Sequence, residues 1–150
     1  MRVVTGLKWS VGGLLLWLAV GMTGCAKTPD EQQIREVIAH LQTAMESREP
    51  KAFMRGIDED FTGGAGELDR NALHNLLRGQ VLANEHINVV LGPIEIVLQG
   101  DRATASMTAT MAGGSARWLP ERGAVYRIDS GWKKTGGEWR CVNASWERNL

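Results

Sequence analysis

Apolar residues recur at helical spacing in the first half of the chain. Between residues 31 and 45 they lie three or four positions apart, which predicts a helix with one buried face. The residues of that face are Ile34, Val37, Ile38, Leu41 and Met45. Just before them, Thr28 is placed to cap the helix, Pro29 to occupy its first turn and Glu31 to complete a capping box.

Two further helices are expected before residue 84. Pro50 ends the first helix and opens a shorter one, because proline cannot donate the backbone hydrogen bond that a continuing helix needs. The buried side of this short helix is predicted to hold Phe53, Met54 and Ile57. Asp69 is placed to cap a third helix. Its apolar positions are Leu73, Leu76, Leu77 and Val81.

The second half of the chain alternates in the manner of strands. Residues 87–98 are predicted to form a strand interrupted at Gly92-Pro93, and a turn follows at residues 99–101. Small and apolar residues then alternate with Thr and Ser. The first set, Ala103, Ala105, Met107, Ala109 and Met111, should face the helices. The Thr104–Thr110 face should meet water or a second subunit, so a homodimer through the sheet is one expectation.

A terminal hairpin is predicted from residues 124–132 and 139–146, which flank a Gly136-Gly137 break. A two-residue turn would place Lys133 opposite Arg140, and facing like charges are unfavourable. A three-residue loop is therefore expected, with Trp132 opposite Arg140. In that register the inner face holds Tyr126, Ile128, Trp132, Val142, Ala144 and Trp146, and the outer face holds Trp139.

Helices followed by meandering strands predict an α+β domain, with three N-terminal helices packed on a curved antiparallel or mixed sheet. Ile34, Leu73, Met107 and Ile128 should converge on one interior.

The first 24 residues have the layout of a signal peptide. Arg2 and Lys8 precede an apolar run over residues 11–20, and small residues follow. A membrane-spanning helix is the alternative, but it needs about 20 apolar residues and this run is shorter.

The segment Met22-Thr23-Gly24-Cys25 resembles the lipobox of bacterial lipoproteins, although Met22 stands where that family usually has Leu. The resemblance implies cleavage before Cys25, acylation of Cys25 and anchoring to a membrane through the lipid. The next residue is Ala26 rather than Asp, which in this family resembles lipoproteins of the outer membrane rather than of the inner membrane. We therefore expect a signal peptide over residues 1–24, a lipidated tether over 25–27 and one domain over 28–150. The alternative is a soluble secreted product. Acylation would leave Cys141 without a disulfide partner.

Charge gives no case for nucleic-acid binding, since Lys+Arg and Asp+Glu number 17 each. No cofactor is implied. The Asp58–Asp69 segment partly mimics a calcium loop but lacks the bidentate Glu, so no metal site is expected.

The order of elements, together with Asp58–Phe61, Asp129-Ser130-Gly131-Trp132, residues 137–140 and Ala144-Ser145-Trp146, resembles the nuclear-transport-factor-2-like (cystatin-like cone) superfamily. Within it, the chain is similar to uncharacterised proteobacterial lipoproteins. The resemblance implies a cone of three helices in a curved sheet. It leaves function open, because this superfamily includes isomerases, dehydratases, cyclases and non-catalytic binding modules.

An enzyme of this shape would need a buried acid or base. The weak candidates are Asp58, Asp60, Glu95 and Asp129, with Tyr126 as a proton donor. Asp129 is more simply read as part of a solvated network with Arg127 and Lys133 on the polar face, and no motif surrounds His74 or His86.

Aromatic residues suggest binding. Tyr126, Trp132 and Trp146 either line an apolar pocket or fill the core, and Trp118 is a candidate contact surface. The leading hypothesis is therefore an outer-membrane lipoprotein whose non-catalytic cone domain, in the cell envelope, binds a small apolar ligand or an envelope protein. The alternative is an isomerase-, cyclase- or dehydratase-like enzyme acting on a small apolar substrate.

Overall fold

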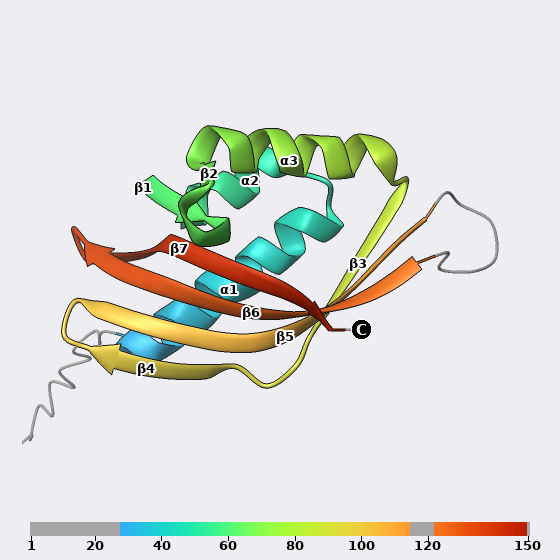
Figure 1. Cartoon of the computed structure of the whole chain (residues 1–150). Helices are drawn as coiled ribbons and strands as arrows, with labels where there is room; N and C mark the ends of the chain where they lie inside the picture. Colours follow the sequence, from blue (N-terminus) through green and yellow to red (C-terminus); the bar gives the residue numbers. More distant parts are fainter. Residues whose placement is uncertain (1–27, 115–121, 150) are drawn as a thin grey trace, which may run out of the picture.

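The computed structural model describes residues 28–114 and 122–149 (Figure 1). The expectations for the leader, for Cys25 and for Trp118 lie outside these residues. The helices are α1 (Asp30–Glu46), α2 (Pro50–Phe53), which continues into a 3₁₀ turn, and α3 (Arg70–Ala83). The strands are β1 (Ile57–Gly63), β2 (Leu68–Asp69), β3 (His86–Leu91), β4 (Glu95–Gln99), β5 (Arg102–Gly114), β6 (Arg122–Thr135) and β7 (Glu138–Asn149).

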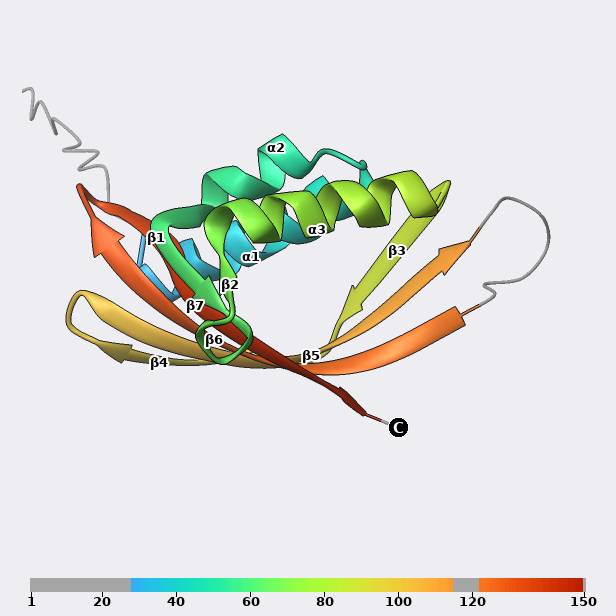
Figure 2. The ribbon, with the colours of Figure 1, turned by 45° about the horizontal axis from the view of Figure 1, so that its top comes forward.

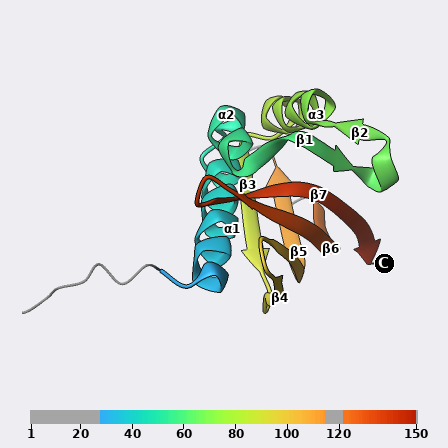
Figure 3. The ribbon, with the colours of Figure 1, turned by 90° about the vertical axis from the view of Figure 1, so that its left-hand side faces the viewer.

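The strands form one mixed sheet in the order β2-β1-β7-β6-β5-β3, and β4 also pairs with β5. The β1–β7 pair is parallel and the other pairs are antiparallel. The sheet curves, and the helices lie on its concave side (Figures 2 and 3). The predicted α+β class is confirmed.

The start of α1 is held by the sheet rather than by a cap. Pro29 occupies the N-cap position without a side-chain hydrogen bond, so the predicted Thr28 cap is wrong. The side chain of Gln33 donates to the Thr28 carbonyl instead. The Asp30 carboxylate forms an ion pair with Lys134 and accepts from Trp139 Nε1 at 3.2 Å. Both partners come from the β6–β7 hairpin, so α1 begins where that hairpin turns.

The other helix predictions differ in outcome. Asp69 caps α3 as predicted, with its Oδ1 accepting from the Ala72 amide at 2.7 Å. Ile57, which we expected on the short second helix, instead begins β1. The Asp58-Glu59-Asp60 run has low strand propensity, and its strand exists because β1 pairs with β7 and buries Ile57 and Phe61.

The predicted strand interruption at Gly92-Pro93 is confirmed, because β3 ends at Leu91 and β4 begins at Glu95. The Gly92 amide donates to the Thr108 carbonyl at 2.9 Å. A Cβ at position 92 would lie 2.3 Å from Thr108 Oγ1, so only glycine fits there without a shift. The predicted alternation along β5 also holds, since Ala103, Ala105, Met107 and Ala109 are buried.

The predicted hairpin register is wrong. Thr135 pairs with Glu138 across a two-residue turn, and Lys133 does lie opposite Arg140. Gly136 and Gly137 both have positive φ, the conformation that such a tight turn needs. The repulsion of these two half-buried cations costs about 0.2–1 kcal/mol, which is less than the free energy gained by burying Trp139 and Cys141 in this register.

A β-bulge divides β7 and shifts its register against β6. Trp132 pairs with Cys141 and Gly131 pairs with Asn143, so Val142 is the extra residue. Before the bulge Trp139 and Cys141 face inward, and both are buried. After it Ala144 lies opposite Ser130 and Trp146 opposite Ile128, so these two also take the inner side. The predicted placements of Trp139 on the outer face and Val142 on the inner face are corrected.

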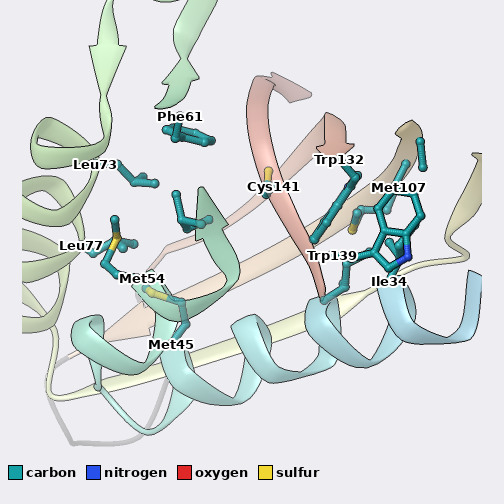
Figure 4. Close-up of a cluster of buried hydrophobic side chains, with 14 of the residues drawn as sticks. Ile34, Met45, Met54, Phe61, Leu73, Leu77, Met107, Trp132, Trp139 and Cys141 are labelled. Atoms are coloured by element: carbon teal, nitrogen blue, oxygen red, sulfur yellow. The ribbon is translucent and has the colours of Figure 1, made fainter. Parts of the chain in front are cut away.

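One hydrophobic core lies between the helices and the sheet (Figure 4). It includes Ile34, Leu73 and Met107, with Ile128 packed against them, as the sequence predicted. In the part of the chain that the structure describes, no helix is both long and apolar enough to cross a membrane.

Candidate functional site

The interior of the cone is occupied by the protein's own side chains. Trp132 is 2 % exposed, Trp139 3 % and Ile34 is fully buried. Figure 4 shows these three gathered with Met107 between α1 and the sheet, while Phe61, Leu73 and Leu77 lie toward the other end of the cluster. The two hollows described below both lie at the outer surface of the molecule. These described side chains pack against one another in one hydrophobic cluster between the helices and the sheet.

Polar groups in this interior bond to one another. Trp132 Nε1 donates to Ser130 Oγ at 2.9 Å, and that hydroxyl donates to the Ala105 carbonyl at 3.0 Å. Within residues 28–114 and 122–149, Arg70 Nε is the one buried side-chain nitrogen or oxygen atom without a hydrogen-bond partner. The two bonds satisfy the Trp132 and Ser130 side chains inside the core.

The aromatic residues predicted to line a pocket do not come together as one wall. Trp132 is part of the packed core, and Tyr126 is half-buried. Trp146 is 37 % exposed and lies opposite Ile128 rather than opposite Tyr126. Its ring packs over Gly63, where an added Cβ would meet it at 3.2 Å.

The candidate carboxylates also lie apart. Asp129 is on the outer face of β6, accepts from Ser106 Oγ at 2.6 Å and pairs with Arg127 at 3.3 Å. Asp58 is half-buried on β1 and accepts from the Asp60 amide at 3.1 Å, while Asp60 itself is exposed. Strand β7 separates β1 from β6, so the three carboxylates form no common site. Glu95 is exposed on β4.

Cys141 is buried beside β1, where Ile57 is its strand partner. Burial, the largest cause, raises the pKa of its thiol to about 12; a backbone hydrogen bond with Asn143 opposes the rise, and the charge of Asp58 adds a smaller part of it. The thiol stays protonated at neutral pH and is a poor nucleophile.

The most distinctive surface feature is a hollow of about 610 Å³ between α2 and α3, which we call the basic groove. Figures 2 and 3 show the two helices side by side on the far side of the molecule from β4. Its ionisable lining residues are Glu49, Lys51, Arg55, His74 and Arg78. Pro50 and Ala52 provide an apolar part of the wall. Three permanent cations therefore share this concave surface with one carboxylate.

Helical spacing creates this arrangement. Lys51 and Arg55 are four residues apart, as are His74 and Arg78, so each pair lies along one side of the groove. None of the three permanent cations forms an ion pair within the described ranges. The sequence analysis missed these residues. The signal that could have found them was the Lys51–Arg55 spacing together with Arg70, His74 and Arg78 along one helix face.

Two arginines beside the groove fix α3. Arg70 Nη2 donates to the Met54 carbonyl at 3.2 Å, and Arg48 Nη2 donates to the Val81 carbonyl at 2.7 Å. These bonds tie both ends of α3 to the α1–β1 connection, so the two walls of the groove are held at a set separation.

A second hollow, of about 380 Å³, lies between α1 and the start of β7. Glu36 and Glu138 line it together with Arg55 and Arg140, so its charges balance. Arg55 borders both hollows. No group of three or more His, Cys, Asp or Glu side chains able to hold a metal ion occurs in the part of the chain described.

Neither a scan against protein-family models nor a search of curated proteins finds a match to this sequence. Solved structures do match. A nuclear-transport-factor-2-like protein of unknown function from Pseudomonas putida has 17% identity and a TM-score of 0.69, covering 80% of this chain and 87% of its own. A cystatin-like-fold protein from Novosphingobium aromaticivorans has 22% identity and a TM-score of 0.63. The match covers 78% of this chain and 80% of that protein.

A third match, also from Novosphingobium aromaticivorans, is provisionally named a scytalone dehydratase; it has 12% identity and a TM-score of 0.69, covering 80% of this chain and 84% of its own. Bd1075 from Bdellovibrio bacteriovorus has a TM-score of 0.69 at 14% identity, and this chain spans only 41% of its length. At these identities the comparisons show the fold alone.

Proposed function

Since this chain has the nuclear-transport-factor-2-like, cystatin-like fold, we propose that it is an outer-membrane-anchored lipoprotein whose cone domain binds a ligand or protein and catalyses no reaction. The observation that supports the non-catalytic part is the packed interior of the cone, to which Trp132, Trp139 and Met107 belong. The basic groove between α2 and α3 is the binding surface that we assign to it.

An enzyme on this fold is the alternative that the provisional dehydratase name of one neighbour suggests. Acid–base catalysis needs a carboxylate or histidine that reaches a bound substrate in a dry cavity. Asp60 and Asp129 instead lie toward solvent, and Asp58 bonds to its own strand. These positions favour the binding module.

The lipid anchor is supported by the lipobox-like Met22–Cys25 segment and by the short distance between it and the domain. Five residues lead from Cys25 to Asp30, where α1 begins, and extended chain spans at most about 17 Å over that length. An acylated Cys25 would therefore keep the domain close to the lipid surface.

Mass spectrometry of the chain recovered from a bacterial envelope tests the anchor. We expect a mature N-terminus at Cys25 carrying acyl chains, and we expect Cys25→Ser to move the protein into the soluble fraction. A mature chain that begins elsewhere, or a Cys25→Ser variant that stays in the membrane fraction, would contradict the proposal.

A further inference from the structure

We propose that the basic groove binds a small polyanion that carries at least two phosphate or carboxylate groups. This inference rests on the proposed binding role of the domain and names the ligand chemistry of its site. It differs from the small apolar ligand expected from the sequence, which the filled cone leaves without a described cavity.

The first argument is the local excess of positive charge. The whole chain has 17 basic and 17 acidic residues, yet Lys51, Arg55 and Arg78 line one hollow with Glu49 as the one carboxylate among its lining residues. Cations gathered without ion-pair partners repel one another, and a concave surface concentrates their field on an anion that enters it. An anionic ligand would remove that repulsion.

The second argument is the separation of the charges. Lys51 lies on α2 and Arg55 on the 3₁₀ turn that follows it, and these two residues present two cationic centres on one wall. Arg78 on α3 presents a third on the other wall. A single phosphate can meet only part of this set, whereas a ligand with two or more oxyanion groups can meet both walls. Arginine also binds phosphate and carboxylate through two parallel hydrogen bonds.

The third argument is size and place. A hollow of about 610 Å³ suits a small molecule, since ligand sites measure roughly 300–1,000 Å³. Arg55 also lines the hollow beside Gln33 and Glu36, so the groove reaches back along α1.

The test uses the full chain in nonionic detergent micelles, titrated with inorganic pyrophosphate in a calorimeter. Lys51→Gln with Arg55→Gln removes two cations from one wall. The matched control is Arg102→Gln with Lys133→Gln, which removes two cations that face each other on β5 and β6. We expect the groove pair to weaken binding by at least about tenfold, since each lost charged hydrogen bond contributes more than 1 kcal/mol, and the control to change it by less than about twofold.

Other ligands and a third variant complete the design. Arg78→Gln, on the opposite wall, should weaken pyrophosphate binding as well, and circular dichroism should show all variants folded. Citrate should bind and monophosphate should bind more weakly, because the groove needs separated charges. Micelles that contain phosphatidic acid should be added as competitors. If they displace pyrophosphate, the phosphate group of a lipid headgroup can occupy the groove.

Three results would overturn the inference: no heat with either polyanion, equal losses in the groove and control pairs, or monophosphate binding as tightly as pyrophosphate. Its failure is separable from that of the anchor. An acylated chain that binds no polyanion refutes this inference alone, and an unacylated chain that binds pyrophosphate refutes the anchor alone.

Discussion

The thiol of Cys141 lies among apolar neighbours between β1 and β6, and this surrounding sets its chemistry. Cys141 is 4 % exposed. The charged thiolate is poorly solvated there, which is why its pKa rises from 9.0 to about 12. Proximity to Asp58 adds to this effect but creates no acid–base pair, because the thiol stays neutral.

This burial predicts a pH dependence of stability. Below pH 9 the thiol is protonated in both the folded and the unfolded chain. Between about pH 9 and 12 the unfolded chain loses the proton and the folded chain retains it, so the free energy of unfolding falls by up to about 1.4 kcal/mol per pH unit.

The measurement is urea unfolding of the wild type and of Cys141→Ala from pH 8 to 11. The variant should be less stable at pH 8, because it leaves a small cavity, but its stability should fall less steeply above pH 9. Equal slopes for the two proteins would refute the assignment. Iodoacetamide should also leave Cys141 of the folded protein unmodified.

At the scale of the elements, two tryptophans of β7 in the β6–β7 hairpin differ clearly in burial. Trp139 is buried and its indole N–H bonds to Asp30, whereas Trp146 is 37 % exposed over Gly63. We expect Trp139→Ala to cost about 3–5 kcal/mol in the free energy of unfolding and Trp146→Ala to cost clearly less.

Chemical denaturation of both variants makes the comparison. Trp139→Phe should recover most of the loss, since it keeps an aromatic ring in the core and removes only the bond to Asp30. An equal cost for the two alanine variants would contradict the difference in burial between Trp139 and Trp146.

Much of the fold follows from local patterns. The apolar stripe of α1, the Asp69 cap and the alternation of β5 are each decided by residues within a few positions, so the sequence predicts them. The hairpin register is different, because a one-residue bulge changes which side chains face inward, and its position depends on packing against α1 and β1. The strand over Ile57–Gly63 likewise exists only through its partner β7.

The candidate site was less predictable. The basic groove joins residues 49–55 to residues 74–78, and only the packing of α2 on α3 makes them neighbours. Tyr126, Trp132 and Trp146 were named because aromatic rings often line pockets, yet Trp132 is part of the core, Tyr126 is half-buried and Trp146 is 37 % exposed.

At the scale of the whole molecule, the outer face of the sheet remains a candidate interface. Thr104, Thr108 and Thr110 are exposed along β5, and Val90 and Val97 on the neighbouring strands are 58 % and 56 % exposed. Val90 lies opposite Thr110 and Val97 opposite Thr104, so methyl groups extend across three strands. We propose that two copies pack through this face.

Light scattering in detergent, corrected for the micelle, should then give the mass of a dimer. Thr108→Arg places a charge at the centre of the face and should yield a monomer without lowering the melting temperature by more than a few degrees. Thr135→Arg, at the exposed hairpin turn, is the control and should remain dimeric. A monomeric wild type would refute the interface.

The attachment of Asp30 to the hairpin has a mechanical consequence. A chain held by acyl groups is pulled whenever its surroundings move, and that pull enters the domain at the first residues of α1. There the Asp30 carboxylate is held by Lys134 and Trp139, so tension would pass directly into β6 and β7. In the anchored protein that we propose, a pull on the tether would therefore load the paired strands β6 and β7 together with α1.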